Sequence, residues 1–132
     1  PGRVGSLAPG KSRFSSMCPS IVFQGGIPFV VIGAPGGTQI TMGVLQVLLN
    51  ILDFDMSMSD AVIAPRFSGT SNPIDVSNRI PRFATKELEA MGYDVIRWPQ
   101  SYAFAWVHGI RIDSGTLTGG ADPGTDGMAL TV

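Results

Sequence analysis

Charged side chains are scarce in this sequence, and their scarcity excludes one large class of partner. Only 14% of the 132 residues are charged, against about 25% in an average globular domain. The nine Lys and Arg residues form no basic run, whereas a nucleic-acid binder needs a cationic stripe that neutralises phosphates. The composition therefore predicts no nucleic-acid partner.

Cysteine and histidine each occur once, which excludes most metal and redox chemistry. Cys18 is the sole cysteine, so the chain can form neither an internal disulfide nor a cysteine zinc cluster. It has no His neighbour and is interpreted as core filler. His108 stands in the alternating run 105–110 and is interpreted as a strand residue with a hydrogen-bonded ring. We expect no metal and no cofactor.

The sequence also lacks a long apolar run and a signal peptide. Its most apolar stretch, residues 44–52, is interrupted by Gln46 and Asn50 and is far shorter than the roughly 18 apolar residues of a membrane span. The chain begins at Pro1 without an initiator Met, which suggests a processed or incomplete chain. Because few charges accompany 44% hydrophobic residues, we expect a partner chain to cover part of the surface, a neutral monomer being the alternative.

A hairpin is predicted near the start of the chain. Residues 1–14 are rich in Gly and Pro and are predicted as loop. Apolar runs at 20–23 and 28–32 flank a glycine-containing turn at 24–27, which is typical of a β-hairpin. The second run is continuously apolar instead of alternating, which predicts a strand covered on both faces.

Three helices follow from capping and periodicity. Thr38 is the predicted N-cap of a helix that runs to about Phe54 and is apolar around most of its circumference, so we expect it to be nearly engulfed. Residues 57–60 resemble a capping box and start a short helix that Pro65 stops. A third helix is predicted over 85–91, with a glycine at its C-terminal end.

The remaining segments are predicted as loops and short strands. Residues 67–82 are predicted as mostly loop, with a brief strand at 74–76, and a further strand is predicted at 94–97. A strand pair at 103–112 and 116–121 flanks a Gly-containing turn. Strands, helices and strands in this order favour a layered α+β fold over alternating βαβ units.

Two features could carry chemistry. Gly36 and Gly37 lie between a buried strand and a helix, where free N–H groups attract anions and developing oxyanions. The spacing fits no dinucleotide or phosphate loop, and a plain turn is the alternative. Ser15 and Ser16 precede the first strand, where their hydroxyls either donate hydrogen bonds to a ligand carboxylate or satisfy local backbone.

Taken in order, these segments resemble the C-terminal part of the small subunit of the gamma-glutamyltranspeptidase family, which are N-terminal-nucleophile amidohydrolases. The residues that carry the resemblance are 9–11 (Pro-Gly-Lys), 15–19 (Ser-Ser-Met-Cys-Pro), 33–40 (Gly-Ala-Pro-Gly-Gly-Thr-Gln-Ile), 44–46 with Asn50, and 64–66 (Ala-Pro-Arg). A weaker similarity continues through residues 88–92, 107–110, 120–123 and 126–127.

The resemblance implies a fold and a mechanism. The fold is a four-layer αββα sandwich, of which residues 1–132 would be a single-domain fragment of the small, catalytic subunit. A precursor cleaves itself and exposes a threonine, whose hydroxyl attacks a gamma-glutamyl amide such as glutathione. By the same analogy, Gly36 and Gly37 would form the oxyanion hole, and Ser15 and Ser16 would bind the substrate α-carboxylate.

The resemblance also implies partners, because the threonine lies outside this chain. We expect the large subunit and the upstream part of the same precursor to complete the site, in a periplasmic or extracellular enzyme. Two differences from the family's sequence pattern argue against strict specificity for gamma-glutamyl substrates. Gly124 follows Asp122-Pro123 where the family usually has Arg, and residues 67–69 lack a common His. The alternatives are a cephalosporin or glutaryl acylase of the same fold and a non-catalytic binding homologue.

Overall fold

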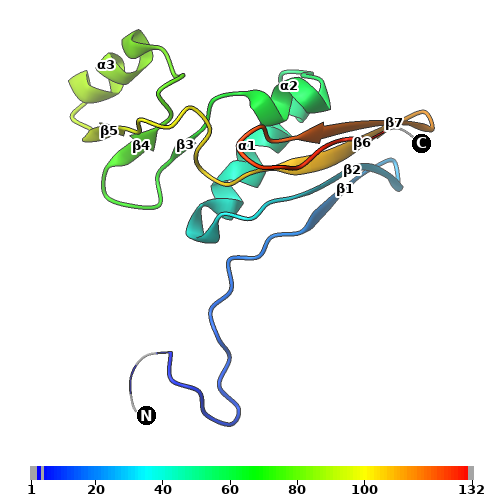
Figure 1. The fold of residues 1–132 in the computed structure, drawn as a ribbon, viewed down its shortest axis with the longest axis horizontal. Coiled ribbons are helices and arrows are strands. Elements are labelled where there is room, and N and C mark those ends of the chain that lie inside the picture. The colour runs from blue at the N-terminus through cyan, green and yellow to red at the C-terminus, as the bar shows by residue number, and fades with distance from the viewer. Residues whose placement is uncertain (1–2, 4, 131–132) are drawn as a thin grey trace.

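Two separate β-sheets and three α-helices make up the part of the chain that the structure describes (Figure 1). The structure is a computed structural model and describes residues 3 and 5–130. The strands are β1 (Ser20–Gln24), β2 (Ile27–Gly33), β3 (Phe67–Ser68), β4 (Ile74–Val76), β5 (Val95–Arg97), β6 (His108–Asp113) and β7 (Thr116–Ala121). The helices are the 3-10 turn η1 (Gly37–Gln39), α1 (Ile40–Leu52), α2 (Met58–Ile63) and α3 (Arg82–Ala90).

The larger sheet is antiparallel and consists of two hairpins in the order β1-β2-β6-β7. The first hairpin turns at Gly25 and Gly26, with φ of 59° and 82°, and the second at Ser114 and Gly115, with φ of 48° and 85°. Positive φ at both central residues matches the right-handed twist of the strands. Both predicted hairpins are confirmed, although residues 103–107 are loop and not strand.

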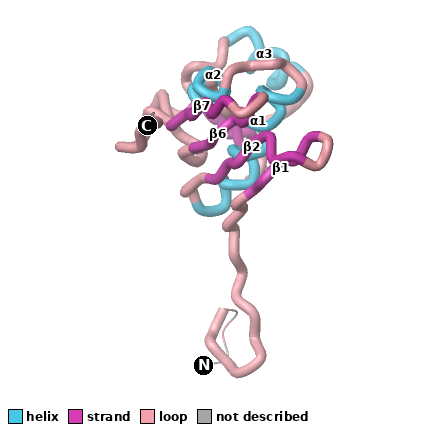
Figure 2. The backbone as a smooth tube through the Cα atoms, turned by 90° about the vertical axis from the view of Figure 1, so that its right-hand side faces the viewer, coloured by secondary structure: helices cyan, strands magenta, loops and turns pink. Residues whose placement is uncertain are grey.

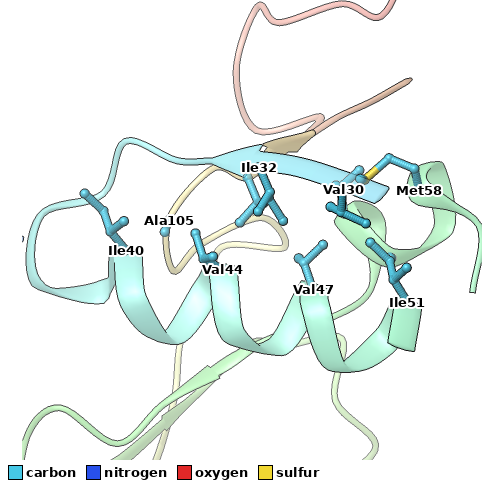
Figure 3. Packing of buried hydrophobic residues seen from close by; sticks show 11 residues of the cluster. Val30, Ile32, Ile40, Val44, Val47, Ile51, Met58 and Ala105 are labelled. Carbon is cyan, nitrogen blue, oxygen red and sulfur yellow. The ribbon is translucent and has the colours of Figure 1, made fainter. Parts of the chain in front are cut away.

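Helices α1 and α2 cover one face of this sheet. Val30 and Ile32 of β2 point toward Val44 and Val47 of α1, and Met58 of α2 closes one end of the layer (Figure 3). All five side chains are buried. Alternate residues of a strand meet one helix stripe, so a single hydrophobic core forms between the two layers.

The opposite face of the sheet has little cover from this chain, which corrects two sequence predictions. Burial alternates along β2, and Val31 is 39% exposed, so the strand is not covered on both faces by the described residues. Helix α1 is likewise not engulfed, since Leu45 and Leu49 are exposed. A continuous apolar run predicts apolar surroundings but not which chain supplies them.

The smaller sheet has the order β3-β4-β5. It contains one parallel strand pair, although the sequence favoured a fold without βαβ units. Strands β4 and β5 pair in parallel and are joined through α3, which makes one βαβ unit. Helix α3 begins three residues before its predicted start because Pro81 serves as its N-cap. The predicted glycine end is confirmed, since Gly92 has a φ of 93°.

The structure confirms two predictions made from local sequence, the capped helix α2 and the loop that precedes β1. The Ser57 Oγ accepts a hydrogen bond from the Asp60 N–H at 3.0 Å, as the capping box predicts, and α2 ends before Pro65. The described residues before β1 form a tail that extends away from the body (Figure 2). No helix in the described part of the chain is long and apolar enough to cross a bilayer.

Candidate functional site

The sheet topology brings the predicted site segments to one end of the molecule. Ser20 pairs with Ile32, so the segment that enters β1 and the loop that leaves β2 lie at the same sheet end. In both backbone views the tail leaves the body beside the loop between β2 and α1 (Figures 1 and 2). Gly33 pairs with His108, and His108 pairs with Ala121, so the start of β6 and the end of β7 are also here.

The glycine bend occupies this end, between β2 and η1. Gly36 has a φ of 147° and Gly37 a φ of 61°, and the Gly36 C=O accepts a hydrogen bond from the Gln39 N–H at 3.3 Å. Within residues 5–130, neither glycine N–H donates a hydrogen bond, so both donors are without a partner in this part of the chain. Thr38 is not the helix cap: η1 starts at Gly37, and the N-cap of α1 is Gln39.

Gly36 is required by packing as well as by conformation. A Cβ at this position would lie 2.5 Å from the Ala105 Cα and 2.7 Å from the Ala105 Cβ. The Trp106 N–H donates a hydrogen bond to the Pro35 C=O at 3.0 Å. A Cβ at Gly37 would meet no atom within 4 Å, so Gly37 is needed only for its positive φ. The bend therefore rests directly on the loop at 104–106.

The loop at 104–106 has an unusual backbone. Phe104 and Ala105 have φ values of 71° and 62° and are both buried. Left-handed backbone costs a non-glycine residue about 1–2 kcal/mol, so other contacts must hold these two residues in place. The Phe104 ring packs edge-on against Trp98, with 5.2 Å between ring centroids. The sequence predicted a strand here and gave no signal of the loop.

A buried ion pair holds this loop. The Arg66 Nε donates to the Phe104 C=O at 3.3 Å, and its Nη2 donates to the Ala105 C=O at 3.0 Å. The same Nη2 forms an ion pair with Asp122, and both side chains are almost fully buried, at 3% and 0% exposed. The Gly124 N–H donates to the other Asp122 oxygen at 2.8 Å. Asp122 is therefore held by the Arg66 guanidinium and by the Gly124 backbone.

The two serines differ in what they contact. Ser15 is exposed, and its Oγ accepts a hydrogen bond from the Met17 N–H at 3.3 Å. Ser16 is half-buried, and its hydroxyl makes no hydrogen bond among the described residues; since no buried side-chain polar atom there lacks a partner, this hydroxyl is open to solvent. The local-backbone alternative therefore applies to Ser15 alone. A hydroxyl that accepts one hydrogen bond keeps its proton for a ligand.

The predicted site residues do not line either of the two cavities that stand out. The larger, about 1380 Å³, lies on the open sheet face and is lined partly by Gly33, His108 and residues 127–130. The smaller, about 430 Å³, lies between α3 and β5. Neither cavity includes Ser15, Ser16, Gly36 or Gly37. Their convergence on one ligand stays a prediction.

The single His and the single Cys have structural contacts. His108 is the first residue of β6, and its Nε2 lies 3.3 Å from the Thr125 Oγ1. Cys18 is a free, half-buried thiol that packs against the core. No three potential metal ligands cluster anywhere in the part of the chain that the structure describes.

Comparisons with known proteins agree with this architecture. The family model for gamma-glutamyltranspeptidase matches residues 1–132. A glutathione hydrolase proenzyme of Pseudomonas aeruginosa is 36% identical, covering 99% of this chain and 25% of that protein. The Acylase ACY 1 proenzyme of Pseudomonas sp. strain SE83 is 34% identical, covering 100% of this chain and 24% of that protein.

A solved gamma-glutamyltranspeptidase from Pseudomonas nitroreducens, complexed with L-DON, superposes with a TM-score of 0.85 at 31% identity. The match covers 100% of this chain and 70% of that one. It confirms the predicted fold class, an α+β part of an N-terminal-nucleophile hydrolase sandwich. The sequence resemblance, the fold and the full-length family match agree, and the chain belongs to the gamma-glutamyltranspeptidase family.

Proposed function

We propose that this chain is the C-terminal part of the catalytic subunit of a gamma-glutamyltransferase or hydrolase that acts on gamma-glutamyl amides such as glutathione. The observation that carries the proposal is the bend at Gly36 and Gly37. It presents two N–H groups without partners among the described residues, at the sheet end where the tail with Ser15 and Ser16 also leaves the body. Free backbone donors at a helix start are suited to a developing oxyanion.

The proposed reaction is acyl transfer with a nucleophile from outside residues 1–132. A threonine hydroxyl attacks the amide carbonyl, its own α-amine takes the proton, and the carbonyl oxygen becomes an oxyanion. The N–H groups of Gly36 and Gly37 donate to that oxygen, each contributing about 2.7–4 kcal/mol of transition-state stabilisation. The amide nitrogen leaves with the proton, and water or an amine acceptor then releases the gamma-glutamyl group.

Ser15 and Ser16 bind the substrate α-carboxylate in this proposal. The Ser16 hydroxyl has no partner among the described residues, and Ser15 retains its proton while it accepts from Met17. Hydrogen bonds to a carboxylate are stronger than those between neutral groups. Two adjacent hydroxyl donors would therefore select substrates whose acyl group carries a free α-carboxylate.

The proposal includes a larger protein around this chain. The chain spans about a quarter of the length of the curated relatives it matches, which are named as proenzymes. Its open sheet face exposes Ile21, Val31, Ile110 and Leu117. Burial of one such side chain contributes about 1.5–3 kcal/mol. We propose that the upstream part of the same precursor and a large subunit cover this face and supply the threonine.

The test is an activity assay on protein expressed from the complete coding sequence. A gamma-glutamyl anilide and a matched glutaryl anilide differ only in the α-amino group, because both keep the carboxylate at the far end of the acyl chain. Turnover of the gamma-glutamyl compound is expected. Exclusive turnover of the glutaryl compound would replace the proposal with its alternative, an acylase, whose motivating observation is the similarity to the ACY 1 proenzyme. A protein that hydrolyses neither compound would be a non-catalytic binding homologue.

A further inference from the structure

We infer that Arg66 and Asp122 are positioning residues for the oxyanion-binding bend, acting through the loop at 104–106. The inference rests on the proposed function of Gly36 and Gly37. It assigns a task in catalysis to a buried ion pair that lies outside the proposed contacts with substrate. Three links connect the pair to the bend.

The first link is the contact between the bend and the loop. The Ala105 backbone lies so close to Gly36 that a Cβ added to Gly36 would be only 2.5 Å from the Ala105 Cα. The Trp106 N–H is hydrogen-bonded to the Pro35 C=O at 3.0 Å. Because Gly36 has no side chain and the hydrogen bond joins two backbone groups, no side-chain rotation can absorb a shift of Ala105, and we expect such a shift to displace the bend.

The second link is the conformation of the loop. Phe104 and Ala105 are consecutive left-handed residues that are not glycine, a backbone that persists only where neighbours impose it. The guanidinium of Arg66 imposes it by donating to both of their carbonyl oxygens, at 3.3 Å and 3.0 Å. A rigid, planar fork can reach two successive carbonyls, whereas an ammonium group cannot do so at both angles.

The third link is the pairing of Arg66 with Asp122. Both groups are shielded from water, so each charge depends on the other. Asp122 is fixed in turn by the Gly124 N–H, and Arg66 also donates to the Val62 C=O at 2.7 Å. The pair therefore joins the end of α2 to the end of β7 and gives the guanidinium one orientation. That orientation sets the loop, and the loop sets the bend.

A purely structural ion pair would behave differently from a positioning pair. Loss of a structural pair would lower stability and leave kcat per folded molecule unchanged, and a Lys at position 66 would preserve the charge balance. A positioning pair predicts that Arg66→Lys lowers kcat although the charge is kept, because the two carbonyl contacts are lost. The Lys variant therefore separates the two roles.

The experiment compares Arg66→Lys and Asp122→Asn with Val76→Ala in protein from the complete coding sequence. Val76 is equally buried but lies in the smaller sheet. With a gamma-glutamyl anilide, we expect kcat to fall about tenfold in the first two variants, with KM changed less than about twofold, since displacements of an ångström or less have effects of this size. Val76→Ala should lose stability and keep kcat within about twofold.

Hydrogen exchange at the Trp106 amide supplies a readout that does not depend on turnover. This amide is bonded to Pro35, so its exchange reports on the contact between loop and bend. We expect faster exchange in Arg66→Lys and Asp122→Asn and unchanged exchange in Val76→Ala. Should the unsubstituted protein turn over neither anilide, the proposed function fails, and this exchange still decides whether the ion pair positions the bend.

A third variant covers the case in which both ion-pair variants fail to fold. Ala105→Gly adds no atoms and tolerates the left-handed backbone, but it frees the loop to adopt other conformations. We expect it to fold, to exchange the Trp106 amide faster and to lose about threefold in kcat. A folded Arg66→Lys with kcat and Trp106 exchange equal to the unsubstituted protein would overturn the inference, as would an Ala105→Gly variant with both values unchanged.

Discussion

The two ends of the larger sheet are both built on left-handed backbone, yet they differ in what surrounds it. At the hairpin end, a Cβ added to Gly25 or Gly26 would meet no atom within 4 Å. At the other end, Gly36 touches a buried loop that a buried ion pair holds. Positive φ is therefore common to a simple turn and to the candidate site. What distinguishes the candidate site is close backbone packing and donors without partners.

The largest expected effect on kcat comes from adding a side chain to a glycine at each of the two sheet ends. Gly36→Ala puts a Cβ 2.5 Å from the Ala105 Cα and must displace the bend, so kcat for a gamma-glutamyl anilide should fall about 10²–10³-fold, the loss typical of one oxyanion donor. Gly26→Ala introduces the same kind of backbone strain in open space and should keep kcat within about twofold. Equal kcat values for the two variants would remove Gly36 from the catalytic site.

The packing of α2 on the sheet, between its two ends, can be tested by substituting Met58, which is 1% exposed. Its side chain lies against Gly109 and its backbone against Gly120, where a Cβ would meet its atoms at 2.8 Å and 2.6 Å. Met58→Ala should cost about 2–5 kcal/mol in the free energy of unfolding, because it leaves a cavity. The exposed Met91 is the matched control, and Met91→Ala should change stability by about 0.5 kcal/mol or less in chemical denaturation. A loss of similar size in both variants would show that Met58 is not a core residue.

Substrate binding at the site end is tested by the serine hydroxyls. Ser16→Ala removes a donor without a local partner and should raise KM about tenfold, in line with a hydrogen bond to a charged group. Ser20 is a nearby control, since its hydroxyl is bonded to the Cys18 C=O, and Ser20→Ala should leave KM unchanged. An unchanged KM in Ser16→Ala would exclude Ser16 from the carboxylate site.

The smallest effect is expected far from either end, at the cap of α2. The Ser57 Oγ accepts from the Asp60 N–H, so Ser57→Ala should destabilise the protein by about 1 kcal/mol without changing kcat. Ser59 is exposed on the same helix and serves as the control. When the two variants are compared by thermal melting, Ser59→Ala should leave the melting temperature unchanged. Equal melting temperatures for the two variants would contradict the assigned cap.

Local sequence signals predicted those parts of the fold that depend on neighbours along the chain. The hairpin turns, the Ser57 cap and the glycine after α3 each follow from the conformations that a few residues allow. The predicted coverage of β2 on both faces was wrong for this chain, because an apolar pattern records burial without naming the segment that provides it.

The support beneath the bend was not visible in the sequence. Arg66 and Asp122 are 56 positions apart, and the left-handed Phe104 and Ala105 occur in a run that reads as an alternating strand. Only the folded chain brings these four residues together. The resemblance did include Arg66, Asp122, Gly36 and Gly37, but it gave no reason for Arg66 and Asp122 to act together.

The most direct test of the central claim is a crystal structure of the protein from its complete coding sequence, trapped as the gamma-glutamyl acyl-enzyme. We expect the acyl carbonyl oxygen to lie about 2.7–3.1 Å from the N–H nitrogens of Gly36 and Gly37, with the hydroxyls of Ser15 and Ser16 hydrogen-bonded to the α-carboxylate. An acyl oxygen bound by other donors, with the bend facing away from the nucleophile, would contradict the central claim.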